Sequence, residues 1–273
     1  MTMIAVSGAT GRLGRRVADR LDRPQRLLVR DPARAPQVAG AQVARAEYAD
    51  FAAVRAALEG APTALMVSAS ETPDRVERHR TFVDAAVAAG VRHLVYTSFV
   101  GAAPGATFTL ARDHWATEEH IRASGLGFTF LRDNLYADFV PLMVGEDGVI
   151  RGPGGNGRAA VVAQDDIADA IVAVLREPAA HAGRTYDLTG PQALTFAEMA
   201  AAAGARFHDE TIEEAYASRA RYGAPAWQVD AWVSTYTAVA AGEMSTVDPA
   251  VEQLTGHRAR SLAEVLGEGG SAA

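Results

Sequence analysis

Short apolar runs alternate with longer amphipathic stretches over the first half of the chain. The runs are brief and often apolar throughout, as expected of strands buried on both faces of a sheet. Helical patterns separate them, and the third of these patterns places Arg75 on its solvent side. Repeated strand–helix units predict an α/β fold with a doubly wound parallel sheet and helices on both faces. Strands are expected at 3–7, 27–30, 42–46, 63–67, 92–97 and 128–132, and helices at 12–21, 51–58, 75–89 and 113–123.

The pattern changes after Asn134. Glycines and a proline crowd 146–158, which predicts turns around a short hairpin or an extended segment. A helix is expected over 164–175 and a strand over 184–188, and the pattern is mostly helical from residue 195 onward. A smaller, mainly helical region is therefore expected to follow the parallel sheet.

Three glycines mark the join between the first strand and the first helix. Gly8, Gly11 and Gly14 have the spacing G-x-x-G-x-x-G, with an apolar strand before them and a helical pattern after them. The first two would let the backbone turn tightly beside a pyrophosphate, and the third would let the helix pack close to the sheet. The turn predicts a Rossmann-type dinucleotide site, with a plain strand–helix turn as the alternative. The predicted cofactor-binding residues here are Gly8, Thr10, Gly11, Arg12, Leu13 and Gly14.

The second strand ends at Arg30, where a dinucleotide site reads the adenine ribose. An acidic residue there favours NAD, whereas an arginine pairs with the 2′-phosphate of NADP. Arg30 comes first and Arg34 adds a second donor, although Asp31 between them blurs the choice. We predict NADPH as the cofactor, with NADH as an alternative. Solvated loop arginines are the purely structural explanation.

Composition excludes several classes of function. The 33 acidic and 26 basic residues give a net charge of −7 without a dense basic run, so nucleic-acid binding is not expected. The absence of cysteine excludes thiolate nucleophiles, disulfides and iron–sulfur clusters. No apolar run approaches the roughly 20 residues of a membrane helix, and no signal-peptide core precedes Gly8. A cytoplasmic protein that binds neither membrane nor nucleic acid is expected.

Several segments resemble the NmrA-like atypical short-chain dehydrogenases. The resemblance rests on the glycine turn and on 29–32, 84–91, 96–98, 129–132, 164–168 and 186–191. Within that group the chain is most similar to the type-2 NAD(P)H:quinone oxidoreductases, through 67–71, 79–80 and 113–118. The resemblance implies an NAD(P)-binding Rossmann domain over 1–138 and a substrate-binding region over 139–273, of which 164–190 could pack back onto the first domain. It implies neither flavin nor metal.

One position departs from most short-chain dehydrogenases, which protonate the substrate oxygen with a Tyr-x-x-x-Lys pair. All 26 basic residues are arginine, so that lysine cannot exist here. His114 stands where it would be, and Leu110 replaces the tyrosine. A ketone that accepts hydride needs such an acid, whereas a quinone becomes an aromatic phenolate of tyrosine-like basicity. Direct hydride transfer to a quinone or related conjugated aromatic acceptor is therefore favoured.

Polar side chains at the strand ends are the candidates for contact with the reactants. His114 is expected to donate or relay a proton, since the ordinary pKa of histidine is about 6.5; a structural surface histidine is the alternative. Tyr96 and Ser98 end the fifth strand and are expected to bond the substrate oxygen, with sheet packing as the alternative. Further cofactor contacts, on the nicotinamide side, are expected from Ser68, Ser70 and Thr97.

The substrate is expected to be a small, planar aromatic or quinone molecule. Phe99, Asn134 and Tyr136 would line a flat pocket for it, although aromatic residues here could equally form core. His79 and the aromatic residues of 227–236 are expected to be structural. Two other functions stay open. One is the quinone-reducing component of an O2-dependent hydroxylation (a monooxygenase) in aromatic polyketide tailoring, with or without a separate partner protein. The other is a non-catalytic NAD(P)-sensing regulator. A homodimer also stays open.

Overall fold

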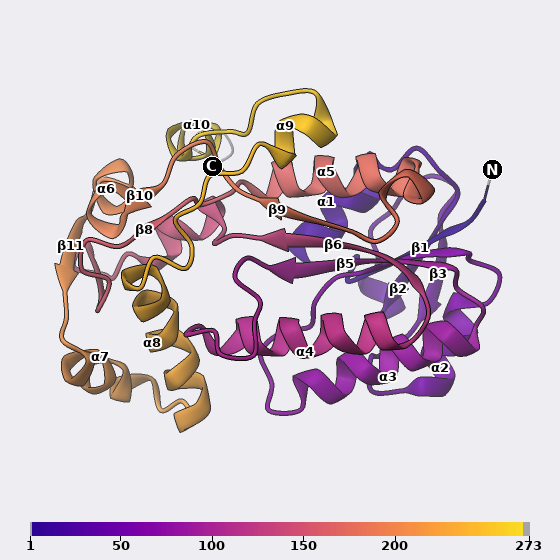
Figure 1. Ribbon diagram of the computed structural model, residues 1–273, viewed down its shortest axis with the longest axis horizontal. Helices are drawn as coiled ribbons and strands as arrows, with labels where there is room; N and C mark the ends of the chain where they lie inside the picture. Colours follow the sequence, from indigo (N-terminus) through magenta and orange to yellow (C-terminus); the bar gives the residue numbers. More distant parts are fainter. Residues whose placement is uncertain (1, 270–273) are drawn as a thin grey trace. The chain divides into compact units, whose positions relative to one another are not determined.

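The computed structural model describes residues 2–269 and contains a seven-stranded sheet (Figure 1). The strand order is β3-β2-β1-β4-β5-β6-β9, so β1 lies where the order reverses. Ile4 pairs in parallel with Gln25 on one side and with Thr63 on the other. The predicted doubly wound sheet is confirmed. Its strands are β1 (Ile4–Ser7), β2 (Gln25–Val29), β3 (Gln42–Arg45), β4 (Thr63–Met66), β5 (His93–Phe99), β6 (Gly127–Asp133) and β9 (Arg184–Leu188).

Helices cover both faces of this sheet, as Figure 1 shows. One face carries α1 (Arg12–Arg20) and α5 (Gln164–Arg176), and the other carries α2 (Phe51–Leu58), α3 (Arg75–Ala88) and α4 (Thr109–Ala123). The predicted helices of this part are confirmed, although α4 begins at Thr109 rather than at residue 113. The start of α2 has a local cause, because the Asp50 carboxylate accepts the Ala53 N–H at 3.0 Å.

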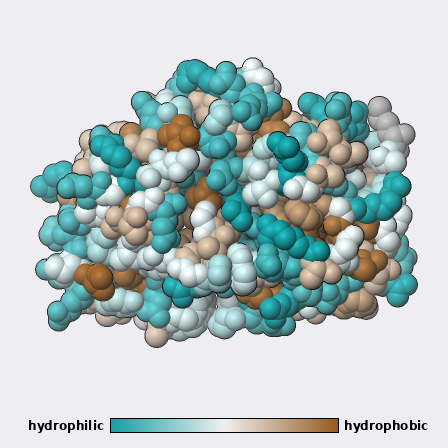
Figure 2. Space-filling view, in the orientation of Figure 1, coloured by the Kyte–Doolittle hydropathy of each residue, from teal (hydrophilic) through white to brown (hydrophobic). Residues whose placement is uncertain are grey.

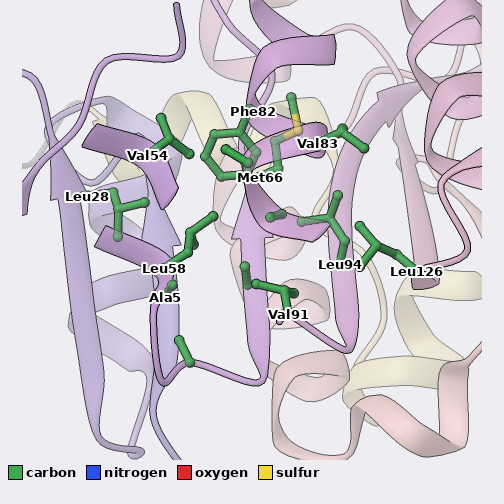
Figure 3. Packing of buried hydrophobic residues seen from close by; sticks show 14 of the residues in the cluster. Ala5, Leu28, Val54, Leu58, Met66, Phe82, Val83, Val91, Leu94 and Leu126 are labelled. Atoms are coloured by element: carbon green, nitrogen blue, oxygen red, sulfur yellow. The ribbon is translucent and has the colours of Figure 1, made fainter. Parts of the chain in front are cut away.

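The core between the sheet and helices α2 and α3 is built mainly from aliphatic residues, together with Phe82, Tyr96 and Phe130; Figure 3 shows part of it around Phe82. Phe82 of α3 and Met66 of β4 are fully buried in it, as are Leu58 and Leu94. Burying one such side chain contributes about 1.5–3 kcal/mol relative to leaving it in water. This core fixes α3 on the sheet and with it the loop between β4 and α3.

Backbone contacts divide the chain into two compact units that interleave along the sequence. The first holds the chain up to Ser98, together with Asp113–Arg132 and Ile167–Tyr186. The second holds Phe99–Arg112, Asp133–Asp166 and the chain from Asp187 onward. The domain boundary expected at residue 138 stays a prediction.

The glycine-rich segment 146–158 was expected to form turns around a short hairpin or an extended segment, and it forms the second: β7 (Val149–Gly152) and β8 (Arg158–Ala159) are extended but do not pair with each other. Instead β7 pairs in parallel with β11 (Arg206–Asp209), a strand that the sequence did not predict. β8 pairs with β10 (Leu194–Thr195). The glycines serve close packing, since a Cβ on Gly152 would lie 2.2 Å from the Tyr236 ring. A Cβ on Gly154 would lie 2.4 Å from the Phe196 ring.

The rest of the second unit is mostly helical, as expected. α6 and α7 each begin with a capping box, formed by Thr195 with Glu198 and by Thr211 with Glu214. Within residues 2–269, no helix is long and apolar enough to cross a membrane. Figure 2 shows hydrophilic and apolar residues interspersed over the visible face. The remaining helices are α6 (Phe196–Ala202), α7 (Ile212–Arg219), α8 (Ala226–Ala240), α9 (Ala250–Thr255) and α10 (Leu262–Gly269), with short 3-10 turns η1 (Pro32–Arg34), η2 (Ala137–Met143), η3 (Pro178–His181) and η4 (Ala220–Tyr222).

Candidate functional site

The turn between β1 and α1 is so tight that side chains at its glycine positions would clash with neighbouring atoms. Gly8 has a φ of +64°, and the N–H of Gly11 donates to the Gly8 carbonyl at 2.8 Å. A Cβ on Gly14 would lie 2.2 Å from the Gly8 carbonyl oxygen. The helix begins without a side-chain cap, and its first turn holds no acidic residue. No side chain therefore caps the first N–H groups of α1, and N–H groups at a helix start are the donors that bind the phosphates of a dinucleotide.

The three charged residues after β2 have different roles. The Asp31 carboxylate accepts the Ala33 N–H at 3.0 Å and so caps the 3-10 turn η1. The side chains of Arg30 and Arg34 lie exposed on either side of it. The acidic residue between the two arginines thus has a local structural role, and contact of Arg30 and Arg34 with a 2′-phosphate stays a prediction.

A cluster of hydroxyl groups that the sequence analysis missed holds the end of β4. The Ser7 hydroxyl accepts the Val67 N–H at 2.9 Å, and the Tyr48 hydroxyl donates to the Val67 carbonyl at 2.6 Å. The two hydroxyls are 2.5 Å apart. Burial raises the pKa of Tyr48, so its phenol stays neutral. Because a Cβ on Gly8 would lie 3.0 Å from Val67 Cβ, this cluster also supports the glycine turn. The serine directly before the turn was the available signal.

Two of the predicted nicotinamide-side residues are brought together by the neighbouring ends of β4 and β5. The Ser68 N–H donates to Thr97 Oγ1 at 2.8 Å, and the two hydroxyl oxygens are 3.4 Å apart. Ser70 is exposed two residues further along the loop. Their contact with a cofactor ribose stays a prediction.

His79 is hydrogen-bonded to the loop after β4 and is structural, in keeping with its expected role. Its Nε2 lies 2.9 Å from the Ala69 amide nitrogen, and its Nδ1 lies 2.9 Å from Thr117 Oγ1. Since an amide N–H can only donate, Nε2 accepts and the proton is on Nδ1. Burial, aided by the charge of Arg75, holds the pKa of His79 well below its usual value. The ring is therefore neutral and fixes the loop backbone.

His114, which lies on α4, is likewise hydrogen-bonded through both ring nitrogens. Its Nε2 lies 3.0 Å from Arg75 Nη2, and its Nδ1 lies 2.9 Å from the Tyr96 hydroxyl. A guanidinium can only donate, so Nε2 accepts and Nδ1 donates to Tyr96. Burial and then the Arg75 charge hold the pKa of His114 well below its usual value. Burial also raises the pKa of Tyr96, which is completely buried. Both predicted catalytic groups are neutral and internally bonded.

Arg75 corrects an expectation, because it does not face solvent. Only 3% of the Arg75 surface is exposed. Its Nε donates to the Ala69 carbonyl at 2.8 Å, and its Nη1 lies 3.3 Å from Asp113 Oδ2. Arg75 lies at the start of α3, and its side chain faces α4 rather than solvent. One guanidinium therefore joins the loop after β4 to His114.

The Ser98 hydroxyl is part of a buried ion cluster. It donates to Glu118 Oε1 at 2.6 Å. Arg132 binds both oxygens of Glu118, at 2.8 and 2.7 Å, and Arg122 adds a contact at 3.0 Å. The carboxylate is completely buried, and two guanidinium groups compensate its charge. Glu118 and Arg132 entered the sequence analysis only as part of the family resemblance, without a role, and a substrate contact for Ser98 stays a prediction.

The predicted substrate-binding residues all belong to the second unit. Asn134 is 1% exposed, and its amide is satisfied by the Met244 carbonyl at 3.0 Å and by the Leu135 N–H at 2.8 Å. Phe99 packs on Phe108 with ring centroids 4.9 Å apart. Asn134 is thus bonded within the core, and the substrate role of all three residues stays a prediction.

Tyr136, the third of these residues, has a partner that the sequence analysis missed. Its hydroxyl donates to Asp133 Oδ2 at 3.0 Å. Burial, partly opposed by this hydrogen bond, raises the pKa of Asp133 to about 8. A carboxyl at the end of a central strand is the kind of signal that could have been noted, because strands of such sheets end at ligand sites.

Comparison with known proteins agrees with this geometry. Quinone oxidoreductase 2 of Escherichia coli (strain K12) is 33% identical over 279 residues, which cover 96% of each chain. NAD(P)H azoreductase of Xenophilus azovorans is 31% identical over 276 residues, again covering 96% of each. A crystal structure of NADPH-dependent quinone oxidoreductase from Escherichia coli, complexed with NADPH, has a TM-score of 0.88 at 32% identity. It covers 97% of this chain and 99% of that one.

A family profile described as NAD(P)H-binding matches residues 8–178. That range starts at the first glycine of the turn and extends beyond α5. It includes Tyr48, His79 and Thr97, which bond the loop after β4, whereas Ser7 lies just before it. The chain therefore belongs to the NAD(P)H-binding, NmrA-like family of oxidoreductases, as the resemblance in the sequence predicted.

Proposed function

We propose that this protein transfers hydride from NADPH directly to a quinone or a related conjugated aromatic acceptor, without flavin or metal. The names of two relatives support the acceptor class, since one is a quinone oxidoreductase and the other an azoreductase. Both kinds of acceptor are conjugated and gain electrons without first becoming a localised alkoxide.

The neutral, fully bonded state of His114 carries the proposal. This histidine stands where most short-chain dehydrogenases keep a lysine that assists a tyrosine acid, and Leu110 takes the place of that tyrosine. Both ring nitrogens of His114 are hydrogen-bonded, to Arg75 and to Tyr96. It therefore cannot replace the usual acid for a ketone, whose alkoxide must be protonated in the transition state. A quinone yields a phenolate of tyrosine-like basicity, which places a much smaller demand on the site.

The residues of the first unit fit a dinucleotide. Bound NADPH supplies the hydride, that is, two electrons and one hydrogen nucleus. The amides of the glycine turn would hold the pyrophosphate, because Gly8 and Gly14 let the backbone pack tightly enough to form the turn: a Cβ on either would clash with Val67 or with the Gly8 carbonyl. Arg30 and Arg34 would pair with the 2′-phosphate, which favours NADPH, whereas Asp31 already accepts the Ala33 N–H through Oδ1.

The test is an absorbance assay at 340 nm with purified protein, NADPH or NADH, and a panel of simple quinones, polycyclic quinones, azo dyes and aliphatic ketones. We expect loss of NADPH absorbance with quinones, much slower loss with aliphatic ketones, and a rate that added flavin does not change. Flavin released on denaturation, or rapid ketone reduction, would contradict the proposal.

Dissolved oxygen is recorded in parallel. Oxygen uptake that matches NADPH loss only with polycyclic quinones would favour the hydroxylating alternative. Cofactor that binds but is never oxidised by any acceptor would favour the sensor. The Gly14→Ala variant, in which the cradle is blocked, is the matched negative control for cofactor-dependent turnover.

A further inference from the structure

The carboxyl group of Asp133 is buried with one oxygen unsatisfied. Asp133 is the last residue of β6 and is 1% exposed. Its Oδ2 accepts the Tyr136 hydroxyl at 3.0 Å, whereas its Oδ1 has no hydrogen-bond partner among the residues that the structure describes. Buried polar atoms are nearly always paired, so an orphaned carboxyl oxygen calls for an explanation.

Protonation removes much of the difficulty. Tyr136 is the titratable group that contacts this carboxyl, and burial raises the pKa of Asp133 to about 8. At neutral pH the group is then a carboxylic acid that carries a proton of its own. Such an acid can donate to the Tyr136 oxygen, which leaves the phenol proton available to a third group.

The backbone around Tyr136 is held firmly. The Ala137 N–H donates to the Val162 carbonyl at 2.9 Å, and the Val162 N–H donates to the Leu135 carbonyl at 2.9 Å. The Tyr136 ring packs edge-on against Phe139, with centroids 5.2 Å apart. Tyr136 is only half-buried, unlike Asp133 beneath it. The pair follows directly from the carboxyl end of β6, a strand of the seven-stranded sheet, and open α/β sheets bind their ligands beyond such ends.

We infer that Tyr136 is a catalytic residue that donates its phenol proton to the reduced acceptor, and that Asp133 is a positioning residue that resupplies that proton. The inference rests on the proposed function and identifies the proton source for it.

The proton steps balance with the hydride. A quinone that has taken up one hydride carries a negative charge on one oxygen. The Tyr136 O–H bond breaks and its proton forms the second O–H of the hydroquinone. The Asp133 O–H bond then breaks to restore the phenol, and the resulting carboxylate takes a proton from water. The sum is one hydride and one proton for each quinone reduced.

A phenol suits this acceptor. The ordinary pKa of tyrosine is about 10, close to that of a hydroquinone oxygen, so the proton moves between groups of similar basicity. Transfer to a more basic anion, such as the nitrogen anion left by reduction of an azo bond, is more favourable and depends more strongly on the donor. The contribution of Tyr136 should therefore grow with the basicity of the reduced acceptor.

The first test compares Tyr136→Phe and Asp133→Asn with wild type on an electron-poor quinone and on an azo dye. We expect Tyr136→Phe to lower kcat by roughly 10²-fold on the dye and by less than about tenfold on the quinone. Asp133→Asn should also lower kcat more on the dye than on the quinone. In the wild type we expect kcat to fall above pH 8, where Asp133 loses its proton, and Asp133→Asn should remove that fall. The matched control is Tyr216→Phe, because Tyr216 and Asp230 form an exposed pair of the same kind at 2.9 Å.

The second test needs no turnover. Infrared spectra of the unliganded protein should show the carbonyl band of a buried protonated carboxyl at neutral pH. That band should disappear as the pH rises through about 8 and should be absent from Asp133→Asn. It should persist in Asp230→Asn, the surface control.

The outcomes separate the two ideas. Wild-type protein that oxidises no NADPH with any acceptor would overturn the proposed function and this inference with it. An active wild type together with Tyr136→Phe rates that match it on every acceptor would overturn the inference alone. So would an infrared band that Asp133→Asn leaves unchanged.

Discussion

The guanidinium of Arg75 donates to Nε2 of His114 across 3.0 Å in the interior of the first unit. This contact decides which ring nitrogen carries the proton, because an arginine side chain cannot accept a hydrogen bond. It also adds a positive charge that opposes a second positive charge on the imidazole. The one hydrogen bond therefore sets both the tautomer and the neutral state of the histidine at the position of the usual lysine.

Replacing Arg75 by glutamine should release this control. We expect the pKa of His114 to rise toward its usual value, although burial will keep it low. Loss of the contacts to Ala69 and Asp113 should lower the free energy of unfolding by roughly 1–3 kcal/mol. The His114 pKa is measured by NMR of the imidazole protons, and stability by urea unfolding. Arg78→Gln on the same helix is the control, since its side chain is more exposed and its ion pairs are worth less. An unchanged His114 pKa would contradict this account.

Stability in acid should depend on the two neutral histidines. The folded-state pKa values of His79 and His114 lie below the unfolded value of about 6.5. The unfolded chain therefore binds more protons as the pH falls below 6.5, and stability is lost in that direction, by up to about 1.4 kcal/mol per pH unit for each ring. His114→Gln should flatten this slope relative to wild type. The measurement is urea unfolding at a series of pH values, and a parallel pair of curves would refute the prediction.

Asp133 should act in the opposite direction. Its folded-state pKa of about 8 lies above the ordinary value of 3.8, so the folded protein holds a proton that the unfolded chain releases. The stability that this group contributes is complete below the unfolded pKa and falls as the pH rises toward 8. Between pH 6.5 and 8 the histidines no longer contribute, so Asp133→Asn should be less sensitive to pH than wild type in that window. Thermal unfolding across it checks this, and equal slopes would count against a raised Asp133 pKa.

Gly14→Ala should damage the cofactor cradle. The new methyl group would lie 2.2 Å from the Gly8 carbonyl oxygen, so α1 must move away from the turn. We expect a loss of about 1–3 kcal/mol in stability from overpacking and NADPH binding weaker by at least about tenfold, measured by calorimetry. Gly105→Ala is the control, because a Cβ there would meet nothing within 4 Å. Unaltered NADPH affinity in Gly14→Ala would show that the turn does not hold the pyrophosphate.

Arg30→Ala should weaken binding of NADPH but not of NADH. A charge-assisted hydrogen bond to a phosphate is worth about 1.5–3 kcal/mol, which corresponds to roughly a 10- to 150-fold rise in Kd. Arg34→Ala should have the same direction and a smaller effect, since it is the second donor. Arg55→Ala, on the exposed side of α2, is the control. Equal losses for both nucleotides would instead indicate a general effect on the turn.

Local patterns were sufficient for the sheet and the cofactor turn. A strand buried on both faces is apolar throughout, and a helix that covers it repeats its apolar positions every three or four residues, so each element is visible within its own segment. The glycine turn is likewise local, because Gly8, Gly11 and Gly14 lie within seven consecutive positions and their spacing reflects the turn itself.

The same reasoning failed wherever the explanation lies in a distant segment. The glycines of 146–158 predicted turns and left a hairpin or an extended segment open, but not that Gly152 and Gly154 make room for the rings of Tyr236 and Phe196. Arg75 looked solvent-facing because a charge near the start of a helix usually is, yet its partner His114 is 39 residues away. Spacing along the chain carries no record of which remote side chain will face a given residue.

Ionisation was decided by tertiary structure alone. Histidine at 114 and aspartate at 133 have ordinary pKa values in isolation, and only burial and the neighbouring groups shift them. The residue types that can do the chemistry can thus be read from the sequence. Which of them hold a proton at neutral pH depends on desolvation and on hydrogen bonds, and these exist only once segments far apart in the chain have packed together.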